Sequence, residues 1–179
     1  MKVYLSSDRD DGFFIEAARK AVANIQSKIP FGVGVIDLVY PPLALGVDTG
    51  KVLSNVLQVL EADIILINAT PTPKEKGTPA EYLIHNPGVM MEYGMVLGQD
   101  SAPGGYRWMG RMPRPTHRVF CGSEVARTLL PPVLNQEDVI SFDRSPAGEK
   151  GLVKKMEEII TTKMGERLSI AFTRNPAGP

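Results

Sequence analysis

The sequence contains 179 residues, a length that predicts one domain with a single sizeable hydrophobic core. Its 20 basic and 20 acidic side chains give a formal net charge of zero, which argues against a nucleic acid polymer as the main partner. A single cysteine, Cys121, excludes an internal disulfide framework and a cysteine-based zinc site, and two histidines argue against a multi-histidine metal site.

No apolar stretch approaches the ~18 residues that a membrane-spanning helix needs, and the first residues turn polar too soon for a signal peptide. We therefore expect a cytoplasmic protein with no membrane contact. Neither a Walker A sequence nor a G-x-G-x-x-G sequence is present. We expect neither a metal nor a cofactor. The apolar neighbours of Cys121 favour a buried structural thiol over a catalytic one.

Short apolar runs predict five strands, at residues 2–5, 32–39, 62–67, 118–121 and 138–142. Helical spacing of apolar residues predicts helices at 14–25, 49–60, 89–98 and 147–168, and a short helical turn within 124–134. The side chains expected to face the core are Phe14, Ala18, Ala21, Val22 and Ile25 in the first helix, Leu53, Val56, Leu57 and Leu60 in the second, and Val153, Met156, Ile160, Met164 and Leu168 in the last.

This alternation of strands and helices predicts an α/β fold with a parallel sheet covered by helices on both faces. We expect a flavodoxin-like three-layer α/β/α sandwich whose five-stranded parallel sheet has the order 2-1-3-4-5. Residues 1–168 form this single domain, and residues 169–179 are expected to be a C-terminal tail. In such sheets ligands bind beyond the carboxyl ends of the strands, which selects residues 6–12 and 70–92.

Glu92 stands out within the second of these segments. It lies three residues after Val89 and four before Val96, so it shares the apolar face of its helix. A carboxylate on such a face must be paired, hydrogen-bonded or used, because its burial alone is costly. Position alone leaves two interpretations open, a structural Glu bonded to its neighbours or a functional one.

Several segments of the chain resemble known proteins. Asn86-Pro-Gly-Val-Met-Met-Glu-Tyr-Gly-Met-Val-Leu-Gly98 resembles the Asn-Pro-Asn-Val-x-x-Glu-x-Gly-x-x-x-Gly segment of TIR-like nucleotide-binding proteins, and more loosely the Glu-x-Gly helix of nucleoside 2-deoxyribosyltransferases. Other similar segments are Val3-Tyr-Leu-Ser-Ser7, Ala62-Asp-Ile-Ile-Leu-Ile-Asn-Ala-Thr70 and Leu130-Pro-Pro-Val-Leu134. They follow one another in the same order over roughly residues 1 to 145.

The resemblance implies cleavage or binding at an N-glycosidic bond of a nucleotide or nucleoside, such as NAD or a nucleoside monophosphate. In these enzymes the matching Glu, here Glu92, attacks the anomeric carbon or stabilises an oxocarbenium-like transition state. Two departures matter. Asn68 replaces the usual Asp of the third strand, and the loop before Asn86 is longer than usual.

The candidate substrate contacts are placed around Glu92. Each has a plainer alternative: capping of the first helix for the residues that follow the first strand, turn formation for Thr70 and Asn86, packing for Phe13 and Met90, and solvation for His85. Asp10 and Asp11 are interpreted as helix caps. The candidate contacts are Ser6, Ser7, Asp8, Arg9, Phe13, Thr70, His85, Asn86 and Met90.

Glycine and proline are concentrated in two stretches, 70–88 and 101–115, which flank the helix that carries Glu92. The second contains Trp108 with Arg107, Arg111 and Arg114. Two interpretations are open: a stacking, phosphate-binding or dimer-contact surface, or a mobile surface insertion. Three hypotheses from different classes therefore remain. They are an N-glycosidic hydrolase or transferase, a non-catalytic nucleotide-binding module, and a self-associating signalling protein.

Overall fold

The computed structural model describes residues 1–8, 11–30, 34–40, 49–71, 86–101, 115–123, 125 and 138–174. Its elements, in chain order, are β1 (Lys2–Ser6), α1 (Gly12–Gln26), β2 (Asp37–Val39), α2 (Thr49–Glu61), β3 (Ile64–Asn68), α3 (Pro87–Ser101), β4 (Thr116–Gly122), β5 (Ile140–Phe142) and α4 (Pro146–Arg174).

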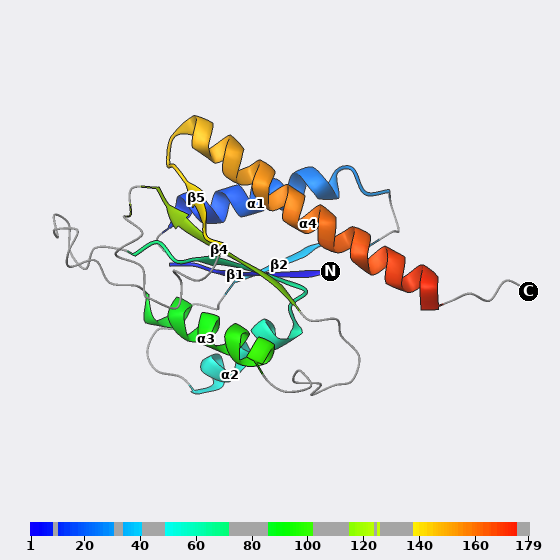
Figure 1. The fold of residues 1–179 in the computed structure, drawn as a ribbon, viewed down its shortest axis with the longest axis horizontal. Helices are drawn as coiled ribbons and strands as arrows, with labels where there is room; N and C mark the ends of the chain where they lie inside the picture. The colour runs from blue at the N-terminus through cyan, green and yellow to red at the C-terminus, as the bar shows by residue number, and fades with distance from the viewer. Residues whose placement is uncertain are drawn as a thin grey trace, which may run out of the picture.

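The five strands form one sheet in the order β2-β1-β3-β4-β5, and every neighbouring pair is parallel. This arrangement confirms the predicted α/β class and strand order. Helices α1 and α4 cover one face of the sheet, and α2 and α3 cover the other (Figure 1). Because all strands are parallel, their carboxyl ends meet at a single edge.

The central strand β3 is buried along its whole length, as its uninterrupted apolar sequence indicates. Its side chains alternate between two cores. Ile64 and Leu66 pack with the α1 and α4 side chains, whereas Ile65 and Ile67 pack with those of α2 and α3. β1 alternates in the same way, so Leu5 enters the first core and Tyr4 the second.

Asp11 caps α1 by accepting a hydrogen bond from the backbone N–H of Phe14 at 3.2 Å, which confirms its predicted role. The predicted buried stripe of α1 is also confirmed, except that Ala17 joins it and Val22 is half-buried. In α2 the predicted stripe is wrong at Leu57 and Leu60, which are exposed, whereas Val56 is half-buried and Val59, which was not predicted, is fully buried.

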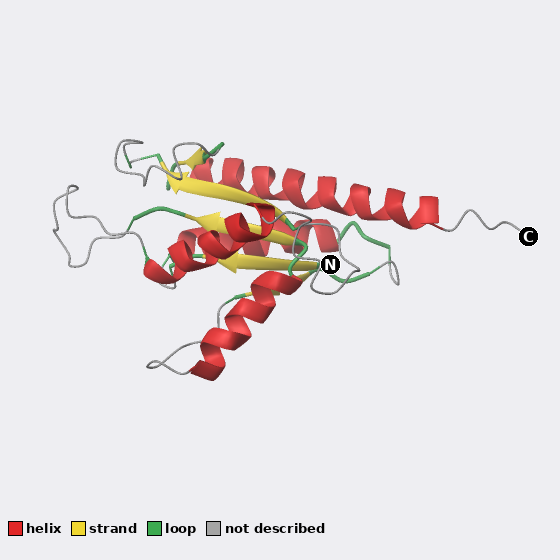
Figure 2. Ribbon diagram, turned by 60° about the horizontal axis from the view of Figure 1, so that its bottom comes forward, coloured by secondary structure: helices red, strands yellow, loops and turns green. Residues whose placement is uncertain are grey.

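The last helix is longer than predicted, because α4 continues to Arg174. Residues 169–174 are therefore helical, and the predicted tail at 169–179 is wrong over that part. The C-terminal end of α4 extends past the edge of the sheet from which the strands start (Figure 2). Met156 and Ile160 are fully buried over the sheet, whereas Leu168, beyond it, is 50% exposed.

Other boundaries differ by a few residues. The second strand is confined to Asp37–Val39, whereas a run from residue 32 was predicted, and β4 is longer than predicted at both ends. The helical turn predicted within 124–134 and most of the stretches 70–88 and 101–115 lie outside the described residues. In the part of the chain that the structure describes, no helix is long and apolar enough to cross a membrane.

Candidate functional site

Glu92 projects from α3 toward β1, at the face of the sheet that α2 and α3 cover. Asn86 directly precedes this helix, and its side-chain oxygen accepts hydrogen bonds from the backbone N–H groups of Gly88 and Val89 at 2.9 and 3.4 Å. Val89, Tyr93 and Glu92 are all buried on the same face of this helix. The prediction that Glu92 shares the apolar face is confirmed, and it is only 3% exposed.

The partner of Glu92 is a hydroxyl group. Tyr4, in the middle of β1, donates a hydrogen bond from its OH to Oε1 of Glu92 at 2.7 Å. Tyr4 is itself fully buried. No ion pair reaches the Glu92 carboxylate among the described residues. A buried carboxylate that faces hydroxyl groups and no cation lacks the compensating charge that structural carboxylates usually have.

Ser6 is the second polar side chain on this face. Residues two apart in a strand point the same way, so Ser6 lies beside Tyr4. Its hydroxyl is fully buried, and Oγ has no hydrogen bond of good geometry within the described residues. It is nevertheless close enough to Glu92 to affect the ionisation of the carboxyl group. A buried hydroxyl without a partner beside a carboxylate is typical of a site that receives a polar ligand.

Burial raises the pKa of Glu92, and the hydroxyl groups of Ser6 and Tyr4 oppose part of that rise. Burial and the adjacent Glu92 also raise the pKa of Tyr4 far above the range of a free tyrosine, so its hydroxyl keeps its proton. The site thus holds a carboxyl group that ionises less easily than usual beside a permanent hydrogen-bond donor. Such perturbed groups cluster at functional sites.

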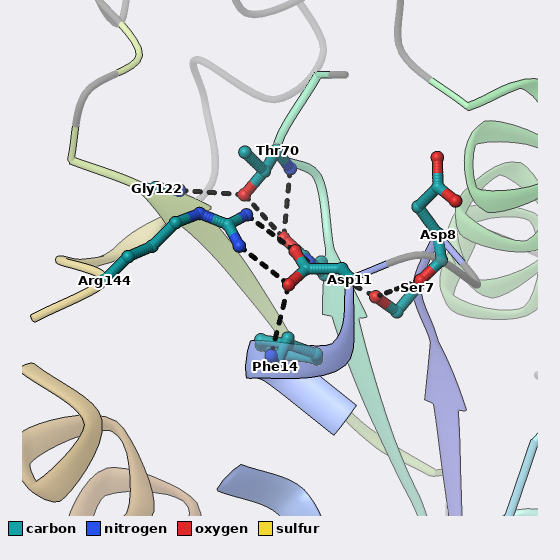
Figure 3. A network of polar contacts seen from close by, with 8 residues as sticks. Ser7, Asp8, Asp11, Phe14, Thr70, Gly122 and Arg144 are labelled. Carbon is teal, nitrogen blue, oxygen red and sulfur yellow. Dashed lines mark hydrogen bonds and ion pairs between the residues drawn. The ribbon is translucent and has the colours of Figure 1, made fainter. Parts of the chain in front are cut away.

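A second polar network lies at the same edge of the sheet, on the opposite face (Figure 3). Asp11 accepts two hydrogen bonds from the guanidinium of Arg144, at 2.8 and 2.7 Å. Its Oδ2 also accepts a hydrogen bond from Nδ2 of Asn68 at 2.7 Å. Burial raises the pKa of Asp11, but Arg144 and the other donors outweigh it and hold this pKa below its usual value. Asp11 therefore stays ionised.

Asn68 links this network to the ends of three strands. Its Nδ2 donates to Oγ of Ser7 at 3.2 Å, and its Oδ1 accepts hydrogen bonds from the backbone N–H and the hydroxyl of Thr70 at 3.1 and 2.6 Å. The Thr70 oxygen accepts a hydrogen bond from the N–H of Gly122 at 2.9 Å. An amide at position 68 fits this network, since a carboxylate there would face the Asp11 carboxylate.

The predicted contact residues therefore separate into groups. Ser6 lies beside Glu92, and Met90 is half-buried against the core on the same side of the sheet. Ser7 and Thr70 belong to the Asp11 network on the other face, and Asn86 caps α3. Residues of the sequence analysis that lie outside the described part of the chain are Arg9, Asp10, His85, Arg107, Trp108, Arg111 and Arg114.

Phe13 stacks on Phe142 with ring centroids 6.1 Å apart and an interplanar angle of 10°. The guanidinium of Arg144 lies 5.8 Å from the Phe13 ring centroid and 5.7 Å from that of Phe142. Phe13 therefore packs against neighbouring side chains, as the packing interpretation predicts. The side chain of Cys121 is buried, as expected. Asp8, at the end of the predicted segment, is half-buried.

Two residues of the site were missed by the sequence analysis. Tyr4 was interpreted as part of an apolar strand, although its position two residues before Ser6 places both on one face. Arg144 gave no signal, because nothing local connects it with Asp11. Among the described residues, no group of His, Cys, Asp and Glu side chains could hold a metal ion.

The chain was also compared with known proteins. No protein-family model matches it, and no curated protein matches it. The resemblance to TIR-like nucleotide-binding proteins and nucleoside 2-deoxyribosyltransferases is therefore an expectation that comes from the motifs alone, and the function must be argued from the site.

Proposed function

We propose that the protein hydrolyses or transfers across the N-glycosidic bond of a nucleotide or nucleoside, with Glu92 as the catalytic residue. The observation that carries this proposal is the state of the Glu92 carboxylate. It is buried at a position where parallel sheets bind ligands, and its partner is the Tyr4 hydroxyl rather than a cation. Such a carboxylate costs stability, which is the usual condition of a group retained for chemistry.

The chemistry follows from the two oxygens of the carboxylate. Tyr4 holds Oε1, so Oε2 is the atom that would attack the anomeric carbon. The new O–C bond forms as the C–N bond breaks, and the electron pair of that bond leaves with the base. Water or a second base then attacks the same carbon, and the O–C bond to Glu92 breaks to restore the carboxylate; the proton that water loses passes to the solvent. Attack by water gives hydrolysis, and attack by a second base gives transfer.

Ser6 supports the same proposal from the ligand side. Its buried hydroxyl, which has no hydrogen bond of good geometry within the described residues, lies beside the carboxylate. A sugar hydroxyl adjacent to the anomeric carbon is the group that would reach it in this arrangement. Binding would then give the buried Ser6 hydroxyl a well-aligned hydrogen-bond partner.

A second candidate function is nucleotide binding without turnover. It is favoured by the position of Asp11. This carboxylate binds Arg144 and Asn68 on the opposite face of the sheet, so it does not act together with Glu92. The amide of Asn68 can donate hydrogen bonds, but it is not an acid and cannot transfer a proton to a departing base. A binding module would use the same two residues, Glu92 and Ser6, to contact the ligand but would leave the N-glycosidic bond intact.

The experiment is chromatography of nucleosides, nucleoside monophosphates and NAD after incubation with the wild type and with Glu92→Gln. We expect base release by the wild type and a loss of about a thousandfold or more in Glu92→Gln, because the amide cannot act as the nucleophile. Glu157→Gln is the matched control, since Glu157 accepts a hydrogen bond from Asn24 at the surface, away from Glu92.

Turnover retained by Glu92→Gln would refute the role of Glu92. Saturable nucleotide binding by the wild type, with no base released over hours, would support the binding module instead.

A further inference from the structure

Arg144 follows the short edge strand β5, and its side chain is held by several contacts. Its guanidinium makes a two-pronged ion pair with Asp11 and lies against the rings of Phe13 and Phe142 (Figure 3). The Asp11 side chain is only 2% exposed. Removal of the guanidinium would leave a buried carboxylate without its main compensating charge.

Asp11 transmits this constraint to Asn68. The amide of Asn68 has only one orientation that satisfies its neighbours, with Nδ2 toward Asp11 and Oδ1 toward Thr70. In this orientation Nδ2 also donates to Ser7, and Thr70 is held to β4 through Gly122. Arg144 therefore determines, through two intervening side chains, where the carboxyl ends of β1 and β3 lie.

These strand ends adjoin the site around Glu92. Ser7 follows Ser6 directly in the chain, and the two side chains point to opposite faces of the sheet. A displacement of Ser7 must therefore move the backbone that carries Ser6, whose hydroxyl lies beside Glu92. Ser6 pairs with Ile67 in β3, so a displacement of Ser6 would also affect the pairing of β1 with β3.

We propose that Arg144 is a positioning residue for the Glu92 site, acting through Asp11 and Asn68 on the ends of β1 and β3. The catalytic consequence rests on the proposed function, whereas the geometric consequence does not. Arg144 touches neither Glu92 nor the place of the reacting atoms, because it lies on the other face of the sheet.

The chain contains a matched control for this proposal. Arg167 of α4 forms an ion pair with Asp63 at 2.8 Å, with side chains 34% and 8% exposed. The Arg144–Asp11 pair has a distance of 2.7 Å and exposures of 38% and 2%. Asp63 precedes β3, so this second pair lies at the opposite edge of the sheet from the site. Both pairs join an arginine to a buried aspartate, and only one is connected to Ser7.

The test compares Arg144→Met and Arg167→Met, which keep the aliphatic stem and remove the guanidinium. The first readout is the pKa of the Glu92 carboxyl, followed by its carbon NMR signal over a pH titration. We expect this pKa to rise in Arg144→Met, because a displaced Ser6 no longer opposes the effect of burial, and to stay unchanged in Arg167→Met.

The second readout is kcat/KM for the best wild-type substrate of the nucleotide panel, with stability measured in parallel. We expect a loss of about ten- to hundredfold in Arg144→Met and little change in Arg167→Met, because a misplaced ligand contact impairs the reaction beyond any loss of stability. If Arg144→Met does not fold, the double variant Asp11→Asn/Arg144→Met removes the buried charge together with its partner and is measured in the same two ways.

Equal effects in the two single variants would overturn the proposal, because they would reflect stability alone. An unchanged Glu92 pKa in Arg144→Met, or in the double variant if that one is used, would also overturn it. If the wild type releases no base from any member of the panel, the proposed function fails, and the Glu92 pKa alone decides the positioning role.

Discussion

At the scale of single residues, the charge of Glu92 must cost the fold stability. Burial raises its pKa, so the folded protein ionises this group less readily than the unfolded chain does. Stability is therefore lost as the pH rises from the unfolded pKa of about 4.3 through the raised folded value. In the proposed reaction, this buried and poorly compensated carboxylate is the group that attacks the anomeric carbon.

We predict that Glu92→Gln is more stable than the wild type at pH 8 and close to it at pH 4. Gln cannot ionise, and its side-chain oxygen can still accept the hydrogen bond from Tyr4. Urea unfolding at both pH values measures this difference. A variant that is destabilised equally at pH 4 and pH 8 would contradict the prediction.

Tyr4→Phe tests the other half of this pair. It removes the only donor in hydrogen-bonding contact with Oε1 among the described residues and keeps the ring in the core. We expect an activity loss of about tenfold or more, because a hydrogen bond to a charged group is lost, and a further rise in the pKa of Glu92. The measurements are turnover and an NMR titration.

Tyr40→Phe is the control for Tyr4→Phe, because the Tyr40 hydroxyl accepts a hydrogen bond from Arg19 at the surface. Equal activity losses in the two variants would show that the Tyr4 hydroxyl has no special role.

At the scale of elements, α4 shows how local geometry sets the start of a helix. Ser145 precedes the helix, and its Oγ accepts a hydrogen bond from the N–H of Gly148 at 3.1 Å. Asp143 accepts a hydrogen bond from the Ser145 N–H at 2.5 Å, which folds the chain back over the first turn. A Cβ atom at position 148 would collide with the backbone oxygen and carboxyl group of Asp143.

Gly148→Ala is therefore predicted to destabilise the protein by about 1–3 kcal/mol, although alanine favours helices. Gly151→Ala, one turn further along α4, is the matched control. A Cβ atom there meets open space, so we expect stabilisation by about 0.5–1 kcal/mol. Chemical denaturation of both variants measures the difference, and a stabilised Gly148→Ala would contradict the collision.

The same helix shows the limit of periodicity. Apolar spacing placed Leu168 on the buried stripe of α4, and the stripe is correct for Met156 and Ile160. Leu168 is 50% exposed. It belongs to the C-terminal part of α4, whose end extends past the sheet (Figure 2). The period determines which side of a helix is apolar, but the length of the neighbouring layer determines how much of that side is covered.

At the scale of the whole molecule, the ion pair of Asp11 and Arg144 joins segments that lie far apart in the sequence. The donors around Asp11 hold its pKa below the usual value, although burial alone would raise it. Its contribution to stability is therefore present above the unfolded pKa of about 3.9 and is lost as the pH falls through the lower folded value.

We predict that Asp11→Asn lowers the free energy of unfolding by about 1–3 kcal/mol at pH 7, because charged hydrogen bonds to Arg144 are lost. The difference from the wild type should narrow as the pH falls below about 4, where the wild type loses the same contribution. Urea unfolding from pH 7 to pH 3 measures it, with the exposed Asp37→Asn as control. A difference that is constant over this range would contradict the prediction.

Local patterns in the sequence determined the fold class, the strand order, the burial of Glu92 and the cap formed by Asp11. Periodicity and capping act over a few residues, and alternating strands and helices leave few ways to build a sheet. Only the tertiary structure decided which groups meet: Tyr4 and Glu92 are 88 positions apart, and Asp11 and Arg144 are 133 apart. Such contacts depend on which strand ends become neighbours, and no short stretch of sequence encodes that.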